Sequence, residues 1–313
     1  MIKIPRVKSK DLLSVTDFSK EEIISIFELS KKLKDELKQG KINSYLKGKT
    51  LGMIFEKTST RTRVSFEVAM FQLGGYALFL SRDDIQLGRG ETVADTAKVL
   101  SRYLDGIMIR CYAHETAIEL AQNSTIPVIN GLTDMFHPCQ ALADFFTIYE
   151  SNRNFKNVKL AFVGDGNNVA QSLMLTAAML GVDFALACPK GYYPKKEVVE
   201  QAFSIASKSG SVITLTSDIA LAVENATHLY TDVWVSMGQE KEASRRKKDF
   251  AKYKITKKIL DKCSSDCKVM HCLPAHRGEE ITDDVIDSPQ SIVLDQAENR
   301  MHVQKAILCT LMK

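Results

Sequence analysis

The sequence contains no apolar stretch that approaches the ~20 consecutive residues a helix needs to span a bilayer. Its first six residues also lack the long apolar region of a secretory signal. These two absences favour a cytoplasmic protein without a membrane partner. The net charge of +4 on 313 residues is too small to indicate a nucleic-acid surface. The single basic run, Arg245-Arg246-Lys247-Lys248, is followed by Asp249 and predicts a solvated helix face.

Cysteine is present in an odd number, seven, and scattered through an ordinary composition, so no disulfide framework is indicated. We expect reduced thiols in a cytosolic protein. Cys263 and Cys267, with His271-Cys272 nearby, come nearest to a zinc pattern. Their spacing is poor for zinc, and no second ligand pair is found elsewhere. The sequence therefore predicts no metal site.

The composition is that of an ordinary globular protein, with 45% apolar and 26% charged residues, and the length suggests two domains. Apolar patterns alternate between strand and helix along the whole chain, which predicts parallel sheets with helices on both faces. Predicted helices cover residues 20–38, 93–100, 114–122, 138–149 and 296–311 and the segment after Arg63. Predicted strands cover residues 50–55, 76–80, 105–110, 126–130, 158–164, 182–187, 211–216, 227–231, 268–272 and 291–294.

The alternation is interrupted at the polar residues 151–154, which places a predicted domain boundary near residue 150. The fold class that follows is α/β, with two doubly wound domains in which helices flank a central parallel sheet. We expect the last helix, about residues 295–313, to pack back on the first domain.

The stretch Ser59-Thr60-Arg61-Thr62-Arg63 lies between a predicted strand and a predicted helix. The first turn of a helix carries unpaired N–H groups and a partial positive charge. Hydroxyls and guanidiniums at that turn make an anion site of the phosphate kind. The alternative is a Ser/Thr helix cap followed by solvated arginines.

Other polar residues of the first half follow predicted strands, where ligands of open parallel sheets bind. Arg110 ends the strand at 105–110, and His137 and Gln140 begin the helix that comes after the strand at 126–130. Singly, each has a simple structural explanation, because Arg110 fits a surface site and His137 fits a helix start. Their shared position favours one anion-binding site.

In the second half, Gly164-Asp165-Gly166-Asn167-Asn168-Val169 follows a strand and opens a helix, as a dinucleotide fingerprint does. Val169 occupies the third glycine position, and no ribose-binding acid follows the next strand. Asn168 instead offers an amide to a small polar ligand. Asp232 and Ser236, which follow the strand at 227–231, could bind an ammonium group.

Four segments together resemble the carbamoyltransferases: Ser59–Arg63, His137-Pro138-x-Gln140, Asp232 with Ser236-Met237-Gly238, and His271-Cys272-Leu273-Pro274. The segment at Asp232 and the one at His271 resemble the ornithine carbamoyltransferases in particular. This resemblance covers nearly the whole chain in order. It implies transfer of the carbamoyl group of carbamoyl phosphate to the δ-amine of L-ornithine, as in arginine biosynthesis or the urea cycle. It also implies that no cofactor is used and that the protein is a homotrimer.

Carried over residue by residue, the resemblance assigns residues 1–150 to carbamoyl phosphate and residues 151–313 to ornithine. The implied carbamoyl phosphate ligands are Ser59, Thr60, Arg61, Thr62, Gln86, Arg110, His137, Gln140, Cys272, Leu273 and Arg300. Gln86 is expected to reach the site of a neighbouring subunit. The implied ornithine ligands are Asn168, Asp232, Ser236 and Met237. The implied catalytic residues are Arg61, Arg110, His137, Cys272 and Arg300.

One position departs from the family pattern, because Cys139 stands where threonine is common. Other acceptors remain as alternatives: aspartate, putrescine and N-acetylated ornithine. An acidic Asp232 fits an amine-bearing acceptor better than aspartate, which carries a second carboxylate. From other classes, a nicotinamide oxidoreductase fits the fold but not the fingerprint, and a non-catalytic binding protein is possible on any fold.

Overall fold

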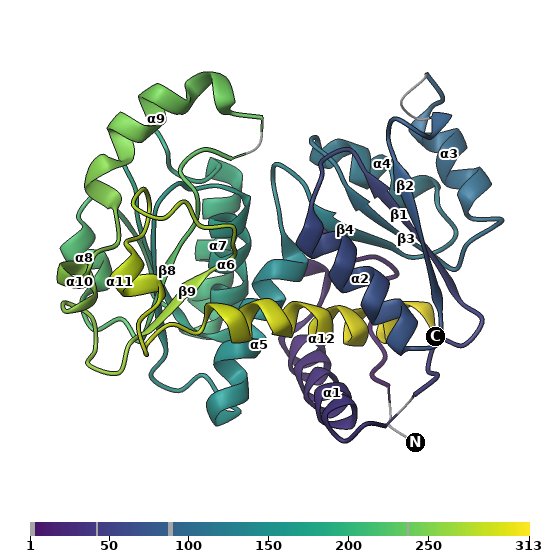
Figure 1. Cartoon of the computed structure of the whole chain (residues 1–313), viewed down its shortest axis with the longest axis horizontal. Coiled ribbons are helices and arrows are strands. Elements are labelled where there is room, and N and C mark those ends of the chain that lie inside the picture. Colours follow the sequence, from purple (N-terminus) through teal and green to yellow (C-terminus); the bar gives the residue numbers. More distant parts are fainter. Residues whose placement is uncertain (1–3, 42, 87–89, 237) are drawn as a thin grey trace. The chain divides into compact units, whose positions relative to one another are not determined.

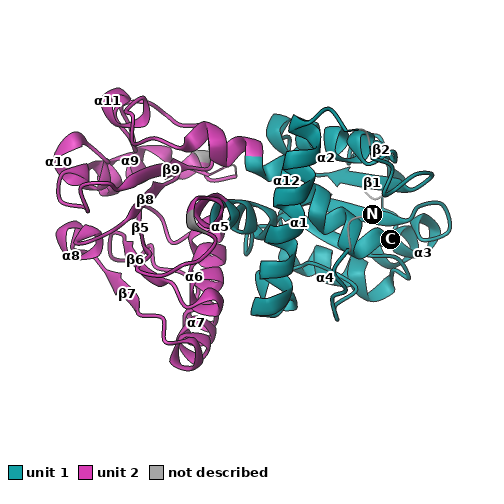
Figure 2. Cartoon of the chain, turned by 90° about the horizontal axis from the view of Figure 1, so that it is seen from below, with its two compact units in different colours: residues 1–146, 299–313 teal, residues 147–298 magenta. Residues whose placement is uncertain are grey.

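The computed structural model describes residues 4–41, 43–86, 90–236 and 238–313 (Figure 1). The chain forms two compact units, coloured separately in Figure 2. The first unit comprises residues 1–146 and 299–313, and the second comprises residues 147–298. Two helices, α5 (Pro138–Asn152) and α12 (Val293–Met312), have residues in both units.

The first unit is built on a four-stranded parallel sheet with the strand order β2-β1-β3-β4. Its strands are β1 (Thr50–Phe55), β2 (Tyr76–Ser81), β3 (Gly106–Arg110) and β4 (Val128–Leu132). Its other helices are α1 (Lys20–Lys38), α2 (Thr60–Gln72), α3 (Val93–Leu100) and α4 (His114–Asn123). Residues of α3 and α4 pack with β1, β3 and β4 in one buried apolar cluster, so these helices cover one face of the sheet.

Helix α1 begins where the sequence predicts, at the capping residue Ser19. The Ser19 hydroxyl accepts a hydrogen bond from the N–H of Glu22, and the Glu22 carboxylate accepts one from the N–H of Ser19. This reciprocal capping box satisfies two N–H groups that the first turn leaves unpaired. Phe27 of α1 packs against Phe146 of α5, with their ring centroids 5.9 Å apart.

Side-chain hydrogen bonds join the C-terminal helix α12 to α1 and α2 of the first unit. Lys34 of α1 donates to Asn299 (2.8 Å), Arg300 donates to Thr62 of α2 (3.0 Å), and Lys305 donates to Gln72 (3.0 Å). The predicted return of the last helix to the first part of the chain is therefore found, and it brings Arg300 next to α2.

The second unit contains a five-stranded parallel sheet in the order β7-β6-β5-β8-β9. Its strands are β5 (Lys159–Val163), β6 (Asp183–Ala187), β7 (Ile213–Thr216), β8 (His228–Thr231) and β9 (Lys268–His271). Its helices are α6 (Asn168–Leu180), α7 (Lys196–Ser209), α8 (Ile219–Val223), α9 (Ala243–Phe250), α10 (Lys257–Leu260) and α11 (Asp283–Ile286). The predicted class of two doubly wound α/β domains is confirmed.

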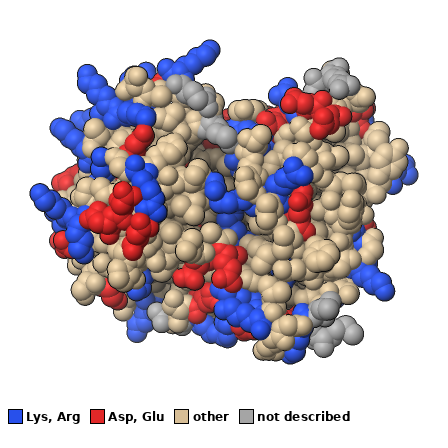
Figure 3. All heavy atoms as spheres, viewed as in Figure 1, with Lys and Arg blue, Asp and Glu red and all other residues tan. Residues whose placement is uncertain are grey.

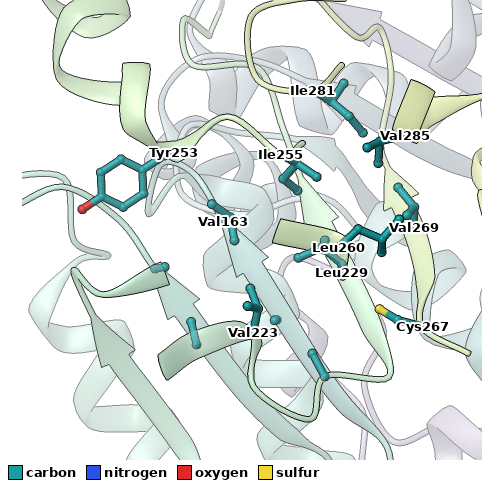
Figure 4. Packing of buried hydrophobic residues seen from close by; sticks show 14 of the residues in the cluster. Val163, Val223, Leu229, Tyr253, Ile255, Leu260, Cys267, Val269, Ile281 and Val285 are labelled. Carbon is teal, nitrogen blue, oxygen red and sulfur yellow. The ribbon is translucent and has the colours of Figure 1, made fainter. Parts of the chain in front are cut away.

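One buried apolar cluster of the second unit lies on one face of this sheet (Figure 4). Val163, Leu229 and Val269, from three neighbouring strands, pack with Leu260 and Val285 of the covering helices. All five side chains are almost fully buried. Burial of this kind is worth about 1.5–3 kcal/mol for each large aliphatic side chain, and it fixes the strand ends that carry polar residues.

Several local predictions are wrong. Residues 291–294 do not form a strand, because only Ser291 pairs, in a single bridge to Val269. The N–H of Gln296 donates to the carbonyl of Ile292 (2.9 Å), which is the first helical hydrogen bond of α12, so α12 begins within the predicted strand. The strand predicted at 126–130 lies two residues later, at β4.

The basic run also differs from the prediction of a solvated face. Arg246 is 4% exposed, whereas its neighbours Arg245, Lys247 and Lys248 are exposed. On the face of the molecule in Figure 3, Lys and Arg are interspersed with Asp and Glu. No helix among the described residues is both long and apolar enough to cross a membrane.

Candidate functional site

The polar residues singled out from the sequence follow the strands at which the chain stops adding strands on one side of the sheet and begins on the other. In the first sheet, chain order reverses between the neighbours β1 and β3, and in the second it reverses between β5 and β8. A parallel sheet opens a crevice beyond the carboxyl ends of the strands at such a switch point. Ser59–Thr62 and Arg110 follow the first pair of strands, and Asn167–Asn168 and Asp232 follow the second.

Helix α2 begins as the sequence predicts, with Ser59 as its cap. The Ser59 hydroxyl accepts a hydrogen bond from the N–H of Thr62 (3.2 Å) and contacts the Thr62 hydroxyl (3.1 Å). Thr60 is exposed and Arg61 is half-buried, while Thr62 is fully buried. Among the described residues, Arg61 makes no ion pair, so its guanidinium is available to an anion at this helix end.

Two buried arginines from distant parts of the chain converge on Thr62. Arg110 donates to the Thr62 hydroxyl oxygen at 3.5 Å, and Arg300 donates to the same oxygen at 3.0 Å. Arg110 and Arg300 are 7% and 4% exposed. Two buried like charges held beside a helix N-terminus are unfavourable unless an anion balances them. The structure therefore brings together Ser59, Thr62, Arg110 and Arg300, and their binding of carbamoyl phosphate stays a prediction.

His137 lies beside this cluster, at the residue before α5. Burial lowers the pKa of His137 well below its usual 6.5, and the positive charges of Arg300 and Arg110 lower it further. A neutral imidazole can donate one hydrogen bond without adding a third buried charge. A neutral ring could donate to a developing oxyanion, and that role of His137 stays a prediction.

The low pKa of His137 can be tested directly. We expect NMR titration of the ring to show a neutral imidazole down through pH 6.5. Arg300→Met should raise the pKa of His137 toward its usual value, because the variant removes a nearby positive charge. Arg102→Met, at an exposed arginine of the same unit, should leave the pKa unchanged. Protonation of the wild-type ring at pH 6.5 would contradict the assignment.

Gln140 lies one helical turn further into α5 and is 1% exposed. Its amide nitrogen donates to Asp144 (2.8 Å), which fixes the orientation of the side chain. Its amide oxygen is buried and accepts no hydrogen bond from any described residue. A buried acceptor of this kind calls for an N–H donor from a ligand, and a carbamoyl NH₂ group supplies one.

Sequence reasoning missed Lys57, which lies just before the Ser59–Arg63 stretch. Lys57 is 7% exposed, and its ammonium lies 4.2 Å from the centre of the Tyr112 ring. Burial lowers the pKa of Lys57, and the charge of Arg110 lowers it further. The signal in the sequence that could have identified Lys57 was its position two residues before the Ser59 cap.

Gln86, the residue predicted to reach a neighbouring subunit, is exposed. Its backbone carbonyl accepts a hydrogen bond from the N–H of Glu91.

In the second unit, the carboxylate of Asp232 is the centre of a hydrogen-bond network. One oxygen accepts from the Val233 N–H (2.8 Å) and from the Cys272 thiol (2.9 Å). The other oxygen accepts from the side-chain amide of Asn167 (2.8 Å). Asn167 also caps α6, because its amide oxygen accepts from the N–H groups of Val169 and Ala170. Sequence reasoning missed Asn167 and chose its neighbour Asn168, which is half-buried at the first position of the helix.

The segment that carries Cys272 and Leu273 is fixed by a buried histidine. The ring of His271 contacts the Glu280 carboxylate at 3.2 Å, and its other nitrogen accepts from the Leu273 N–H at 2.8 Å. Accepting at one nitrogen leaves the other to donate to Glu280, so a neutral ring satisfies both contacts. Leu273 has a φ of 57°, and this hydrogen bond stabilises that unusual backbone. Register pairs Thr231 with His271, which places Asp232 and Cys272 side by side.

Ser236 and Met237 are the remaining residues predicted to bind ornithine. Ser236 is half-buried, and its N–H donates to the side chain of Gln239 (3.1 Å), while Met237 lies outside the described residues. Asp232, His271 and Cys272 present potential metal-ligand atoms within 4.8 Å of one another. Both ring nitrogens of His271 and the Cys272 thiol already make hydrogen bonds. The absence of a metal stays a prediction.

The chain matches two family models. Residues 10–150 match "Aspartate/ornithine carbamoyltransferase, carbamoyl-P binding domain", and residues 156–311 match "Aspartate/ornithine carbamoyltransferase, Asp/Orn binding domain". A relative named ornithine carbamoyltransferase from Oceanobacillus iheyensis is 56% identical over 98% of this chain and 95% of its own length. Another of that name, from Pyrococcus horikoshii, is 55% identical over 98% of this chain and 96% of its own length.

Solved structures agree with these matches. The ornithine carbamoyltransferase structure from Pyrococcus furiosus is 53% identical, covers 99% of each chain and has a TM-score of 0.95. The anabolic ornithine carbamoyltransferase from Campylobacter jejuni is 43% identical, covers 97% of this chain and 99% of its own, and has a TM-score of 0.91. The chain belongs to the aspartate/ornithine carbamoyltransferase family and, within it, to the ornithine carbamoyltransferases.

Proposed function

We propose that this protein transfers the carbamoyl group of carbamoyl phosphate to the δ-amine of L-ornithine, which gives L-citrulline and phosphate. One observation carries the proposal: two buried arginines converge on Thr62 at a helix N-terminus in a chain 56% identical to a named ornithine carbamoyltransferase. We place the reaction in the cytoplasm, in arginine biosynthesis. No cofactor or metal takes part in the proposed reaction.

Carbamoyl phosphate would bind to the first unit, through residues of the predicted domain 1–150 and α12. Its phosphate would accept hydrogen bonds from the first turn of α2, from the hydroxyls of Ser59, Thr60 and Thr62, and from Arg61 and Arg110. Its carbamoyl oxygen would face His137 and Arg300. The free amide oxygen of Gln140 would accept a hydrogen bond from the carbamoyl NH₂ group.

Ornithine would bind to the second unit, in the predicted domain 151–313. The α-amino group is positively charged, and the buried carboxylate of Asp232 supplies the opposite charge. Asn168 would donate to the α-carboxylate, and Ser236 and Met237 would complete the α-amino site. Aspartate as acceptor is disfavoured, because its second carboxylate would meet Asp232.

In the reaction, the neutral δ-amine attacks the carbamoyl carbon, and negative charge develops on the carbamoyl oxygen. Arg61, His137 and Arg300 would stabilise this oxyanion, as preorganised donors do in acyl transfer. The new C–N bond forms, the bond from carbon to the phosphate oxygen breaks, and the leaving phosphate can accept the amine proton. Cys272 and Leu273 would position the δ-amine and the carbamoyl group, and the attack of the δ-amine on the carbamoyl carbon needs no nucleophile from Cys272. The Cys272 thiol donates to Asp232.

The assay that tests the proposal measures carbamoyl transfer with ornithine, aspartate and putrescine side by side. We expect citrulline from ornithine and little product from the other two acceptors. Preferred use of aspartate or putrescine would redirect the substrate assignment, and failure to use carbamoyl phosphate with any of them would overturn it. Tight binding of a nicotinamide cofactor would favour the oxidoreductase alternative.

We propose a homotrimer, in which Gln86 reaches the carbamoyl phosphate site of the neighbouring subunit. What supports assembly is an exposed apolar surface on α2 and the edge strand β2. Val64, Phe71, Tyr76, Leu78 and Phe79 are 51%, 81%, 64%, 37% and 36% exposed. Exposed large apolar side chains on two adjacent elements of one unit are typical of association surfaces. Gln86 follows β2 closely in the chain, so a copy bound at this surface could receive it.

The assembly can be tested with a charge placed on that surface. We expect Phe71→Asp to lower the mass measured by light scattering from a trimer to a monomer, because burying an unpaired carboxylate in an interface is strongly unfavourable. Phe203→Asp, at a 47% exposed aromatic residue in the second unit, is the matched control and should stay trimeric. A wild-type monomer, or a Phe71→Asp trimer, would contradict the proposal.

A further inference from the structure

The second unit contains a buried arginine that the reaction itself does not require. Arg246 lies on α9, and its side chain is 5% exposed. Its guanidinium lies 4.9 Å from the ring centre of Tyr192 and 5.4 Å from that of Phe250. Phe250 is in turn stacked on Trp234. A guanidinium enclosed by aromatic rings is held in place, because it loses little freedom and gains cation–π attraction.

The polar contacts of Arg246 reach two separate loops. Its Nε donates to the carbonyl oxygen of Trp234 at 2.6 Å, and its Nη2 forms an ion pair with the carboxylate of Asp165. Burial raises the pKa of Asp165 to about 6, while the charge of Arg246 opposes this rise. A second acidic residue, Glu242, lies 3.8 Å from Nη1 and is half-exposed.

Each of these loops carries residues assigned above to ornithine. Asp165 follows β5 and precedes Asn167, which donates to Asp232, and Asn168, which would bind the α-carboxylate. Trp234 lies midway between Asp232 and Ser236, which would bind the α-amino group. Arg246 therefore connects the loop after β5 to the loop after β8. These are the two loops between which the α-end of ornithine would lie.

We propose that Arg246 is a positioning residue for ornithine: through Trp234 and Asp165 it holds the two loops at the separation that the α-amino and α-carboxylate groups require. The inference rests on the proposed function, because ornithine is the ligand it concerns. Arg246 itself need not touch the substrate. Its fork-shaped group makes both contacts at once, which a lysine ammonium cannot do in the same geometry.

The test compares Arg246→Lys with the wild-type trimer in steady-state kinetics. We expect the KM for ornithine to rise about tenfold, the effect of losing one charge-assisted hydrogen bond, while the KM for carbamoyl phosphate stays within about twofold. The inhibition constant of L-norvaline, which has the α-groups of ornithine but no δ-amine, should rise by the same factor. Arg245→Lys, at the exposed neighbour on the same helix, is the matched control.

A second variant separates positioning from stability. Asp165→Asn keeps the shape of the partner but removes its charge, and we expect a smaller rise in the KM for ornithine. The double variant should show no larger rise than Arg246→Lys alone, because both changes act through one contact, whereas independent effects would multiply. Thermal unfolding of all variants shows whether the unit remains folded.

The outcomes distinguish this inference from the proposed function. If the wild-type protein makes no citrulline, the proposed function fails, whatever the variants do. If the wild type is active and Arg246→Lys leaves the KM for ornithine and the norvaline constant unchanged, the positioning role fails alone. Equal increases in the KM values of both substrates also overturn it, because they would indicate a general structural effect.

Discussion

Arg61→Ala is expected to lower kcat by about 10²–10³-fold while the protein stays folded, because it removes one preorganised donor from the developing oxyanion. The structure supports a specific role for this side chain. Arg61 lies in the first turn of α2, half-buried and without an ion-pair partner among the described residues. Arg110 and Arg300 approach the site through Thr62 and have their own proposed contacts with carbamoyl phosphate, so we do not expect either to replace Arg61.

The neighbouring Arg63 provides a matched comparison in the same helix turn. Arg63 is exposed, pairs with Glu67 (3.0 Å) and lies over the Phe79 ring. These contacts hold its guanidinium on the surface of the unit, so we do not expect it to bind the substrate. Lysine substitutions keep the positive charge at both positions but remove the planar fork. Arg61→Lys should therefore lose most of the activity, whereas Arg63→Lys should keep nearly all of it. Equal activities of the two lysine variants would remove Arg61 from the site.

The sequence was sufficient for the features that depend on local patterns. Ser59 at the start of α2 is an example, because a capping hydroxyl between an apolar strand and a helical pattern has few other interpretations. The strand ends that carry Arg110 and Asp232 followed in the same way from the alternation of strands and helices. Prediction of the parallel sheets then placed these residues at carboxyl ends, where ligands bind.

What the sequence could not supply were contacts between residues distant in the chain. Arg246 stands in a run of basic residues, and only the fold shows that Asp165, 81 positions away, and the rings of Tyr192 and Phe250 enclose it. Asn167 was missed for a similar reason. Its neighbour Asn168 has the same side chain, and only the cap of α6 determines which of the two amides turns toward Asp232.

Asp232→Asn is expected to lower kcat/KM for ornithine by about 10²-fold and to leave the KM for carbamoyl phosphate nearly unchanged. A hydrogen bond to a charged group contributes about 1.5–3 kcal/mol, and a loss of 2.8 kcal/mol corresponds to about a hundredfold. The Asn167 amide, which donates to Asp232, is expected to increase the loss of ornithine binding in Asp232→Asn. In either orientation the new NH₂ group would face a donor, because on one side lies the Asn167 amide, whose oxygen already caps α6, and on the other side lies the Val233 N–H.

The contact of Asp232 with the α-amino group is measured most directly by comparing kcat/KM for two acceptors. N-acetylated ornithine keeps the δ-amine and the α-carboxylate of ornithine but has no charged α-amine, so Asp232 is expected to favour ornithine over it through the α-amino group. The variant should therefore lose much of its preference for ornithine over N-acetylated ornithine, measured as the ratio of kcat/KM values. Asp261→Asn, at an exposed acid paired with Lys257 (3.0 Å), is the control and should retain the wild-type ratio. An unchanged ratio in Asp232→Asn, together with a lowered kcat, would mean that Asp232 acts through Cys272 on the reacting end and not on the α-amino group.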